Sequence, residues 1–144
     1  MKEHYQANQQ SRLLSVLSTA PAAEVSTFAD QLLANLPEVK VIENRTGLVM
    51  VPYTDTRKGA TFHMGETLIA EARVSMESDE GYGACMGRDT QHALAIAVLD
   101  VACQSGHFLA EIEHFVTEQE AIQNQDEETL LKKVESTRVE METY

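Results

Sequence analysis

The sequence predicts a single α+β domain over residues 1–144, with two N-terminal helices, a small antiparallel sheet of about four strands, then a buried helix and acidic C-terminal helices. Three observations support this class. Apolar residues recur at helical spacing near the N-terminus, apolar and polar residues alternate through the middle, and the most apolar segment starts just after Gly87-Arg88-Asp89. The length suffices for one domain with a substantial core and is short for two.

The first third of the chain predicts two helices. Residues 1–10 are polar, and we expect this segment to be frayed. Apolar residues between 13 and 17 then predict a short amphipathic helix, which stops near the break at 19–21. The second helix, at 25–36, repeats apolar residues at i, i+3, i+4 and i+7, and Pro37 ends it.

Short strands follow. Residues 39–42 and 48–51 are β-like, and the segment from Asn44 to Gly47 between them is typical of a turn. Residues 55–59 then form a charged loop. Each run is short, which favours a small sheet built from several brief strands.

The clearest strand pattern lies at 67–76, where apolar residues occupy alternate positions. Just before it, Gly65 predicts a bulge that re-aims the strand. Glu66 is then either a solvated side chain or a carboxylate at a cleft or interface, and the sequence leaves both readings open. After the turn at 77–81, residues 82–86 are expected to pair with the preceding strand as a hairpin.

The segment that organises the chain begins at the glycines before the next helix. Gly83 and Gly87 let the backbone approach a neighbour without an intervening Cβ. Asp89 stands where the helical periodicity begins, which predicts an N-cap. The helix after it is apolar almost all round as far as Cys103 and must therefore be buried, in this domain or against another chain.

The C-terminal part predicts further helices. Residues 108–116 are amphipathic, a polar patch at 123–126 breaks the helix, and a last helical run holds the apolar residues of 130–134. From His107 onward there are ten Asp or Glu residues against three Lys or Arg residues. Residues 118–144 therefore form an acidic helical arm, either a solvated face or a docking arm, and the sequence favours the solvated face.

Composition limits the partners. A formal net charge of −12 argues against direct contact with nucleic acid, whose phosphates attract basic surfaces. No apolar run is long enough to span a membrane, and the first residues lack the apolar core of a signal peptide. Cys85 and Cys103 are widely spaced and predict small buried hydrophobic residues in a reducing cytoplasm.

No catalytic motif is visible, and no metal site or catalytic residue is expected within this chain. A cap at Asp89 uses the helix N–H groups and disfavours a bound phosphate there, so Arg88 is the residue free to reach a partner. His92 and Asp100 are two helical turns apart and cannot touch. His92 is expected to be a buried, hydrogen-bonded histidine or a polar contact at a subunit interface.

Several separated motifs resemble the PhnG subunit of the bacterial carbon–phosphorus lyase system. They are Thr46-Gly47-Leu48-Val49-Met50-Val51, Phe62-His63-Met64-Gly65-Glu66, Gly81-Tyr82-Gly83, Gly87-Arg88-Asp89-Thr90-Gln91-His92-Ala93 and Leu99-Asp100. They occur in the family's order, and the likeness spans roughly residues 11–140 in element order.

The resemblance implies an accessory subunit, without catalysis of its own, of a multi-subunit transferase. That complex makes α-D-ribose 1-methylphosphonate 5-triphosphate from ATP and methylphosphonate, releasing adenine. The implied partners are subunits of the PhnH, PhnI and PhnJ types. The resemblance also implies that these partners carry out the chemistry. ATP and methylphosphonate are then substrates of the complex, and this chain binds no cofactor.

Two other hypotheses stay open. In the first, Glu66, Arg88 or His92 contributes to an active site shared with another subunit, because these polar residues cluster near glycine-containing turns. Alternatively, the chain is a free-standing homodimer that binds a small molecule, with the acidic tail as a solvated face.

Overall fold

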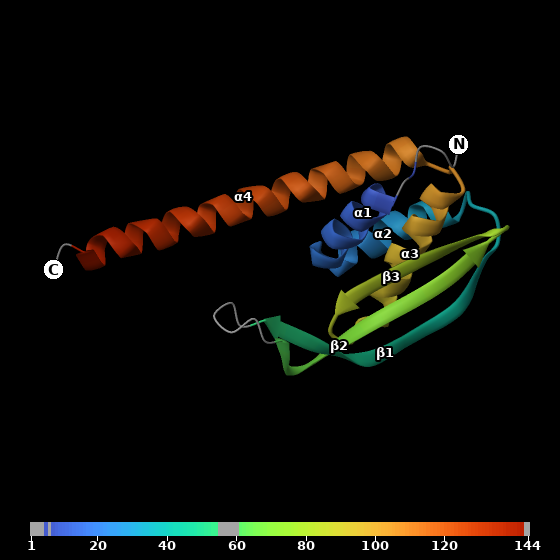
Figure 1. Ribbon diagram of the computed structural model, residues 1–144. Coiled ribbons are helices and arrows are strands. Elements are labelled where there is room, and N and C mark those ends of the chain that lie inside the picture. Colours follow the sequence, from blue (N-terminus) through green and yellow to red (C-terminus); the bar gives the residue numbers. More distant parts are fainter. Residues whose placement is uncertain (1–4, 6, 55–60, 143–144) are drawn as a thin grey trace.

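The computed structural model describes residues 5, 7–54 and 61–142, with side chains described except at 51–54, 61–64 and 137–142. Two helices precede a three-stranded sheet, and two helices follow it (Figure 1). The elements in order are α1 (Ala7–Thr19), α2 (Ala22–Leu33), β1 (Val39–Thr54), β2 (Thr61–Met76), β3 (Asp79–Met86), α3 (Thr90–Gln104) and α4 (Leu109–Glu142). The α+β class predicted from the sequence is confirmed.

The sheet has the order β1-β2-β3 and is antiparallel throughout. It contains one strand fewer than expected, because the turn predicted at Asn44–Gly47 is wrong. β1 runs straight through that segment, and Gly47 pairs with Ile69 of β2. Pairing along the whole of β2 supplies backbone hydrogen-bond partners to residues whose local preference is for a turn. The charged loop predicted at 55–59 lies outside the described residues.

Gly65 lies beside an irregularity in the β1–β2 ladder. Val51 pairs with Gly65 and the next residue, Pro52, pairs with His63, so that β2 carries one extra residue at Met64. This is the arrangement of a β-bulge, which bends a strand locally and increases its twist. The bulge predicted beside Gly65 is present.

The inner face of β2 is the one predicted from the alternating pattern. Ala70, Ala72, Val74 and Met76 are all buried. β3 pairs with β2 from Met76–Asp79 to Ile69–Met86, and Glu77 in the tight turn between the strands has a φ of 56°. The predicted hairpin is confirmed.

α3 lies between the sheet and the other helices, and both of its faces are buried. One face, with Ala93, Ala97 and Val101, packs in a core with β2 and β3. The other, with Ile96 and Leu99 among others, packs in a second core with α1, α2 and the start of α4. This arrangement explains why α3 is apolar almost all round: it belongs to two cores at once.

β3 crosses α3 at backbone contact. A Cβ at Gly83 would overlap the Ala93 carbonyl oxygen and the Ala97 backbone nitrogen, and a Cβ at Gly81 would overlap the Ala97 carbonyl oxygen. The close approach predicted for Gly83 therefore exists, but its partner is α3 of the same chain. The close approach predicted for Gly87 is wrong, because nothing in the described part of the chain lies within 4 Å of a Cβ placed there. At Gly83 the structure differs in another way. This glycine is buried and is not available to a neighbouring subunit.

The N-terminal helices differ from the prediction at their ends. α1 begins at Ala7, inside the segment expected to be frayed, and α2 ends at Leu33, before Pro37. Residues 34–36 continue as turns, with Asn35 N bonded to Leu32 O and Leu36 N bonded to Leu33 O. A tightened last turn of this kind is common at helix ends.

α4 is a single helix of 34 residues, so the break predicted at 123–126 is wrong. Gln is a good helix former, and Asn and Asp, although weaker, neither clash with the preceding turn nor lack an N–H as Pro does. Gln123 also donates a hydrogen bond of 2.9 Å to the Val16 carbonyl of α1, which anchors the helix at that point. Among the described helices, none combines the length and apolar character needed to cross a bilayer.

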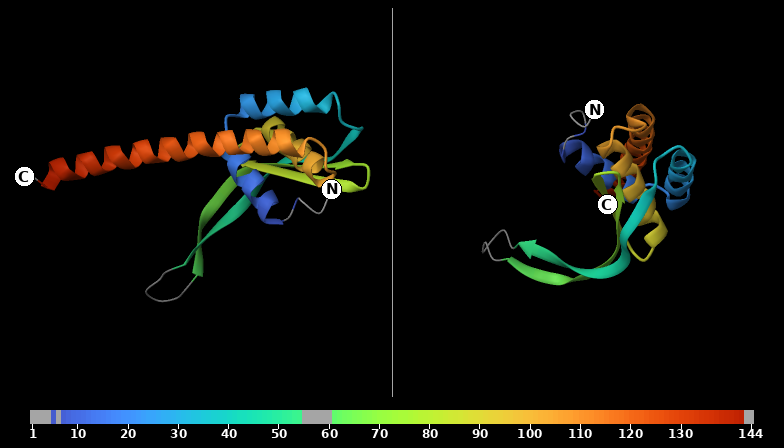
Figure 2. Two further views of the ribbon diagram at one scale, coloured as in Figure 1. Left: turned by 90° about the horizontal axis from the view of Figure 1, so that it is seen from above. Right: turned by 90° about the vertical axis from the view of Figure 1, so that its right-hand side faces the viewer.

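Two elements leave the body of the molecule. α4 continues far beyond the other helices, and the end of the β1–β2 hairpin extends beyond β3 (Figure 1). Seen from above, the two extensions diverge (Figure 2). Both sit at the end of the molecule away from the β2–β3 turn, so the body carries two projecting arms.

Candidate partner-binding site

The N-terminus of α3 is closed by its own cap. Asp89 accepts a hydrogen bond of 2.9 Å from the His92 backbone N–H, as expected for an N-cap carboxylate. Gly87 just before it has a φ of +100°, a conformation that favours glycine. The carboxylate occupies the position where an anion would need free N–H groups, which disfavours a phosphate site at this helix end.

His92 is buried, and its ring is already used. Nε2 lies 2.8 Å from the carbonyl oxygen of Leu17, so the imidazole connects α3 to α1. Only 6% of the residue is exposed. A donated hydrogen bond to a carbonyl satisfies the ring inside the helical core, and this places His92 within the fold rather than on a surface.

Glu66 and Arg88 both lie exposed near the point where β3 ends on β2. Gly87 N donates to Leu68 O at 2.9 Å, the last backbone bond on that side of the sheet before β2 runs on without β3. Glu66 pairs in the ladder with Met50, further along the same hairpin. The structure thus brings Glu66 and Arg88 to one region and leaves His92 inside the helical core.

Beyond that point the hairpin is a two-stranded ribbon, formed by residues 48–54 of β1 and 61–68 of β2. Its described side chains include three consecutive exposed apolar residues: Leu48 is 62% exposed, Val49 44% and Met50 52%. Because successive strand residues point to opposite faces, both faces of the ribbon expose apolar groups. A two-stranded hairpin without a covered face is marginally stable in water, so this surface is suited to contact with another protein.

The outer face of the three-stranded part is polar and bonded across strands. Glu71 of β2 accepts bonds of 2.9 Å from Arg45 Nε of β1 and from the Tyr82 hydroxyl of β3. The Arg45 guanidinium lowers the pKa of Glu71 below its ordinary value, with a further contribution from Tyr82. This network links all three strands on a solvent-facing surface.

A buried carboxylate, Asp100, joins three segments of the chain. It accepts hydrogen bonds from the Tyr5 hydroxyl at 2.6 Å, from Gln10 Nε2 at 3.0 Å and from the Tyr82 backbone N–H at 2.9 Å. Burial raises the pKa of Asp100, and the three hydrogen bonds partly offset that rise. From the sequence, Asp100 stands out only as a polar residue two helical turns from His92, because its partners Tyr5 and Gln10 lie 95 and 90 residues away in the sequence.

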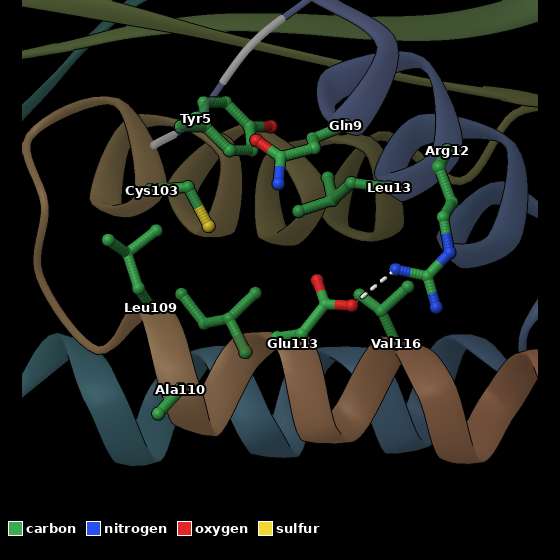
Figure 3. A pocket seen from close by; sticks show the side chains of 10 residues that line it. Tyr5, Gln9, Arg12, Leu13, Cys103, Leu109, Ala110, Glu113 and Val116 are labelled. Carbon is green, nitrogen blue, oxygen red and sulfur yellow. Dashed lines mark hydrogen bonds and ion pairs between the residues drawn. The ribbon is translucent and has the colours of Figure 1, made fainter. Parts of the chain in front are cut away.

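A cavity of about 270 Å³ lies between α1 and α4, next to Cys103 of α3 (Figure 3). Its walls are largely apolar. The polar groups at its edge are engaged within the chain, since the Tyr5 hydroxyl donates to Asp100 and Arg12 donates to Glu113. Burial raises the pKa of the Cys103 thiol to about 12. A nucleotide needs polar groups that orient it, and this cavity offers an apolar hollow instead.

Within the described part of the chain, no group of three or more His, Cys, Asp and Glu side chains is arranged to hold a metal ion. The polar residues singled out from the sequence are thus distributed between a helix cap, the helical core and the base of the ribbon.

Comparison with known proteins decides the family. A family model described as phosphonate metabolism protein PhnG matches residues 8–144. The chain belongs to the PhnG family. The resemblance drawn from the sequence motifs is confirmed by this match.

One curated member of the PhnG family is 28% identical to the chain over 132 residues, covering 90% of this chain and 84% of the relative. That protein, from Rhizobium meliloti (strain 1021), is named alpha-D-ribose 1-methylphosphonate 5-triphosphate synthase subunit PhnG. The match to the family model, over residues 8–144, includes both projecting elements.

Proposed function

We propose that this chain is an accessory, partner-binding subunit of a complex that forms α-D-ribose 1-methylphosphonate 5-triphosphate from ATP and methylphosphonate, with release of adenine. Membership of the PhnG family and the name of the Rhizobium relative support this assignment. The partners are other subunits of the same complex, of the PhnH, PhnI and PhnJ types. They supply the chemistry, and ATP and methylphosphonate bind to the complex rather than to this chain alone.

The observation that carries the partner-binding role is the ribbon. Leu48, Val49 and Met50 expose apolar surface on both faces of a hairpin that projects from the body. Burying a Leu or Met side chain contributes about 1.5–3 kcal/mol, so two such residues supply enough free energy to influence binding measurably. Contiguous apolar surface of this kind marks interaction sites in soluble proteins.

The test is co-expression of the tagged chain with the other subunits of its own complex, followed by purification and native mass spectrometry. The wild-type chain is expected to bring the complex with it. Leu48→Gln with Met50→Gln, two substitutions on one face of the ribbon, is expected to weaken recovery at least tenfold. Leu33→Gln, at an apolar residue of α2 that is 40% exposed, is the control. A wild-type chain that recovers none of these subunits would refute the assignment.

A shared active site is the second candidate, and one observation favours it. Glu66 and Arg88 are both exposed near the base of the ribbon, where a bound subunit would cover them. An arginine there can hold a phosphate or carboxylate through paired N–H groups. Glu66→Ala and Arg88→Ala are expected to leave assembly intact and to lower product formation. Unchanged rates of adenine release in both assembled variants would exclude the shared site.

A further inference from the structure

The second projecting element, residues 124–142 of α4, is called here the arm. It follows Gln123, whose side chain donates a hydrogen bond to the Val16 carbonyl of α1. A lone helix of this length is marginally stable in water unless one of its faces packs against something. Yet the arm has large exposed apolar residues, with Leu130 61% exposed, Leu131 58% and Val134 56%.

These residues continue a face that is buried nearer the body. Ile112 and Val116 pack in the helical core, Gln119 is buried, and Gln123 bonds to α1. Their spacings of four, three and four residues keep them on one side of the helix.

Leu130 and Val134 follow Gln123 by seven and eleven residues, which returns them to that same side. Leu131 lies next to them on one flank. The helix therefore keeps the amphipathic pattern of its packed half after its intramolecular partner, α1, has ended at Thr19. The body covers this side of the helix as far as Gln123, and Leu130 and Val134, which follow the charged Asp126 and Glu127, are exposed.

Charge beside this face restricts what covers the second half. Asp126 and Glu127 lie one turn before Leu130: Asp126 borders this side of the helix, and Glu127, seven residues before Val134, lies on it. Glu128 and Lys132 lie on the opposite side, at the i, i+4 spacing of a helix-surface pair. Between 124 and 142 there are six acidic and three basic residues. An apolar face with acidic flanks is complementary to an apolar groove bordered by Lys or Arg.

A second copy of the chain fits less well than a different subunit. The three apolar side chains of the arm supply roughly 300 Å² per copy at the usual area conversion. Each partner in a stable interface buries about 800 Å², which the arm alone does not reach, and a different subunit of the complex that also contacts the ribbon can supply the remaining area. A second arm would also bring its own acidic flanks.

We infer that the arm binds another subunit of the synthase complex, in an apolar groove bordered by basic side chains, through Leu130, Leu131 and Val134. This inference rests on the proposed function, and it adds a second contact separate from the ribbon. Groove binding of an amphipathic helix places anchors at i and i+4 spacing, which is the spacing of Leu130 and Val134. The acidic arm predicted from the sequence is thereby assigned to docking rather than to solvation.

The experiment compares two double variants in the co-expressed complex. Leu130→Gln with Val134→Gln alters the apolar face, and Glu128→Gln with Lys132→Gln alters the opposite face of the same turns. Affinity is measured by titrating the purified chain onto the complex of the remaining subunits. The first pair is expected to weaken binding about 100-fold and the second less than about threefold. Asp126→Lys with Glu127→Lys is expected to weaken binding and to reduce its dependence on salt.

Hydrogen exchange gives an independent readout, because the arm lies outside both cores and its variants leave the body folded. Amides of the arm are expected to exchange quickly in the isolated chain and slowly in the complex. Two results would overturn the inference if the chain still joins the complex. One is wild-type affinity in the Leu130→Gln, Val134→Gln variant, and the other is arm amides that stay unprotected on assembly. Concentration-dependent dimerisation of the isolated chain that Leu130→Gln abolishes would overturn it in favour of a second copy. A wild-type chain that never joins the complex would instead refute the proposed function.

Discussion

Replacing Asp100 by alanine removes a hydrogen-bond acceptor. Three donors bond to it, one each from the N-terminal segment, α1 and β3. Tyr5, Gln10 and the Tyr82 backbone N–H all bond to this carboxylate, which is 0% exposed. A buried backbone N–H that loses its partner costs about 1–3 kcal/mol, and the two side-chain bonds to a charged acceptor are lost as well. Tyr5 and Gln10 are part-buried and recover some hydrogen bonding from water. We therefore expect Asp100→Ala to lower the free energy of unfolding by about 3 kcal/mol.

Urea unfolding followed by circular dichroism measures this change, and thermal unfolding is expected to show a midpoint about 9 °C lower. Asp100→Asn is the matched variant, since it keeps one acceptor oxygen and the side-chain shape. It is expected to cost about 1–2 kcal/mol, because its NH₂ group faces donors. A value for Asp100→Ala within about 0.5 kcal/mol of wild type, the usual range for surface substitutions, would refute the account of this buried node.

The same carboxylate predicts a pH dependence. Burial raises the pKa of Asp100 in the folded protein above its value in the unfolded chain, so the folded state holds this proton more tightly. The resulting contribution to stability is full below the ordinary pKa of about 3.9 and is lost as the pH rises through the raised folded value. The stability of wild type relative to Asp100→Asn should therefore fall across that window. A relative stability that rises there would contradict the sign of the shift.

Three further predictions concern the packing around α3 and α4. Gly83→Ala is expected to lower stability by about 3 kcal/mol or more, because the new Cβ overlaps the backbone of α3, whereas Gly47→Ala, with open space around it, should change stability by less than about 1 kcal/mol. Urea unfolding of both variants checks this contrast, and equal effects would contradict it. Asp89→Ala removes the cap of α3 and should lower the free energy of unfolding by about 1 kcal/mol, whereas Asp89→Ser should lower it much less. An unchanged thermal midpoint for the alanine variant would argue against capping. Arg12→Ala breaks the bonds from α1 to Glu113 and Glu120 and should cost about 1 kcal/mol at low salt and less in 1 M salt, so a loss that is independent of salt would point to packing instead.

The elements that local pattern defines could be predicted from the sequence. Burial of one face produces the periodicity of α2 and the alternation along β2, and burial on all sides produces the apolar character of α3. Buried positions are occupied mainly by apolar residues, so these patterns can be recognised in the sequence. The Asp89 cap was visible because a capping side chain acts within three residues of itself. Gly83 was singled out correctly for close approach, although its neighbour within the chain was not evident.

The errors arose where a distant segment decides the outcome. Asn44 to Gly47 favours a turn locally, but pairing with β2 extends the strand through it. The polar patch at 123–126 suggested a helix end, but Gln123 is fixed by a carbonyl of α1 more than a hundred residues earlier. The hydrogen bonds to Asp100 likewise come from Tyr5 and Gln10, 95 and 90 residues away in the sequence. Among the candidate site residues, exposure of Glu66 and Arg88 and burial of His92 required the three-dimensional structure.

The position of α3 in two cores has a consequence for how the chain is made. α1, α2 and all three strands are synthesised before residues 90–104, which supply the surface that both cores share. Until that helix leaves the ribosome, the apolar faces of the earlier elements lack their principal partner and are open to aggregation. Once it is present, the sheet layer and the helical layer close around it together. A nascent chain of this protein is therefore expected to complete its fold only late in its synthesis.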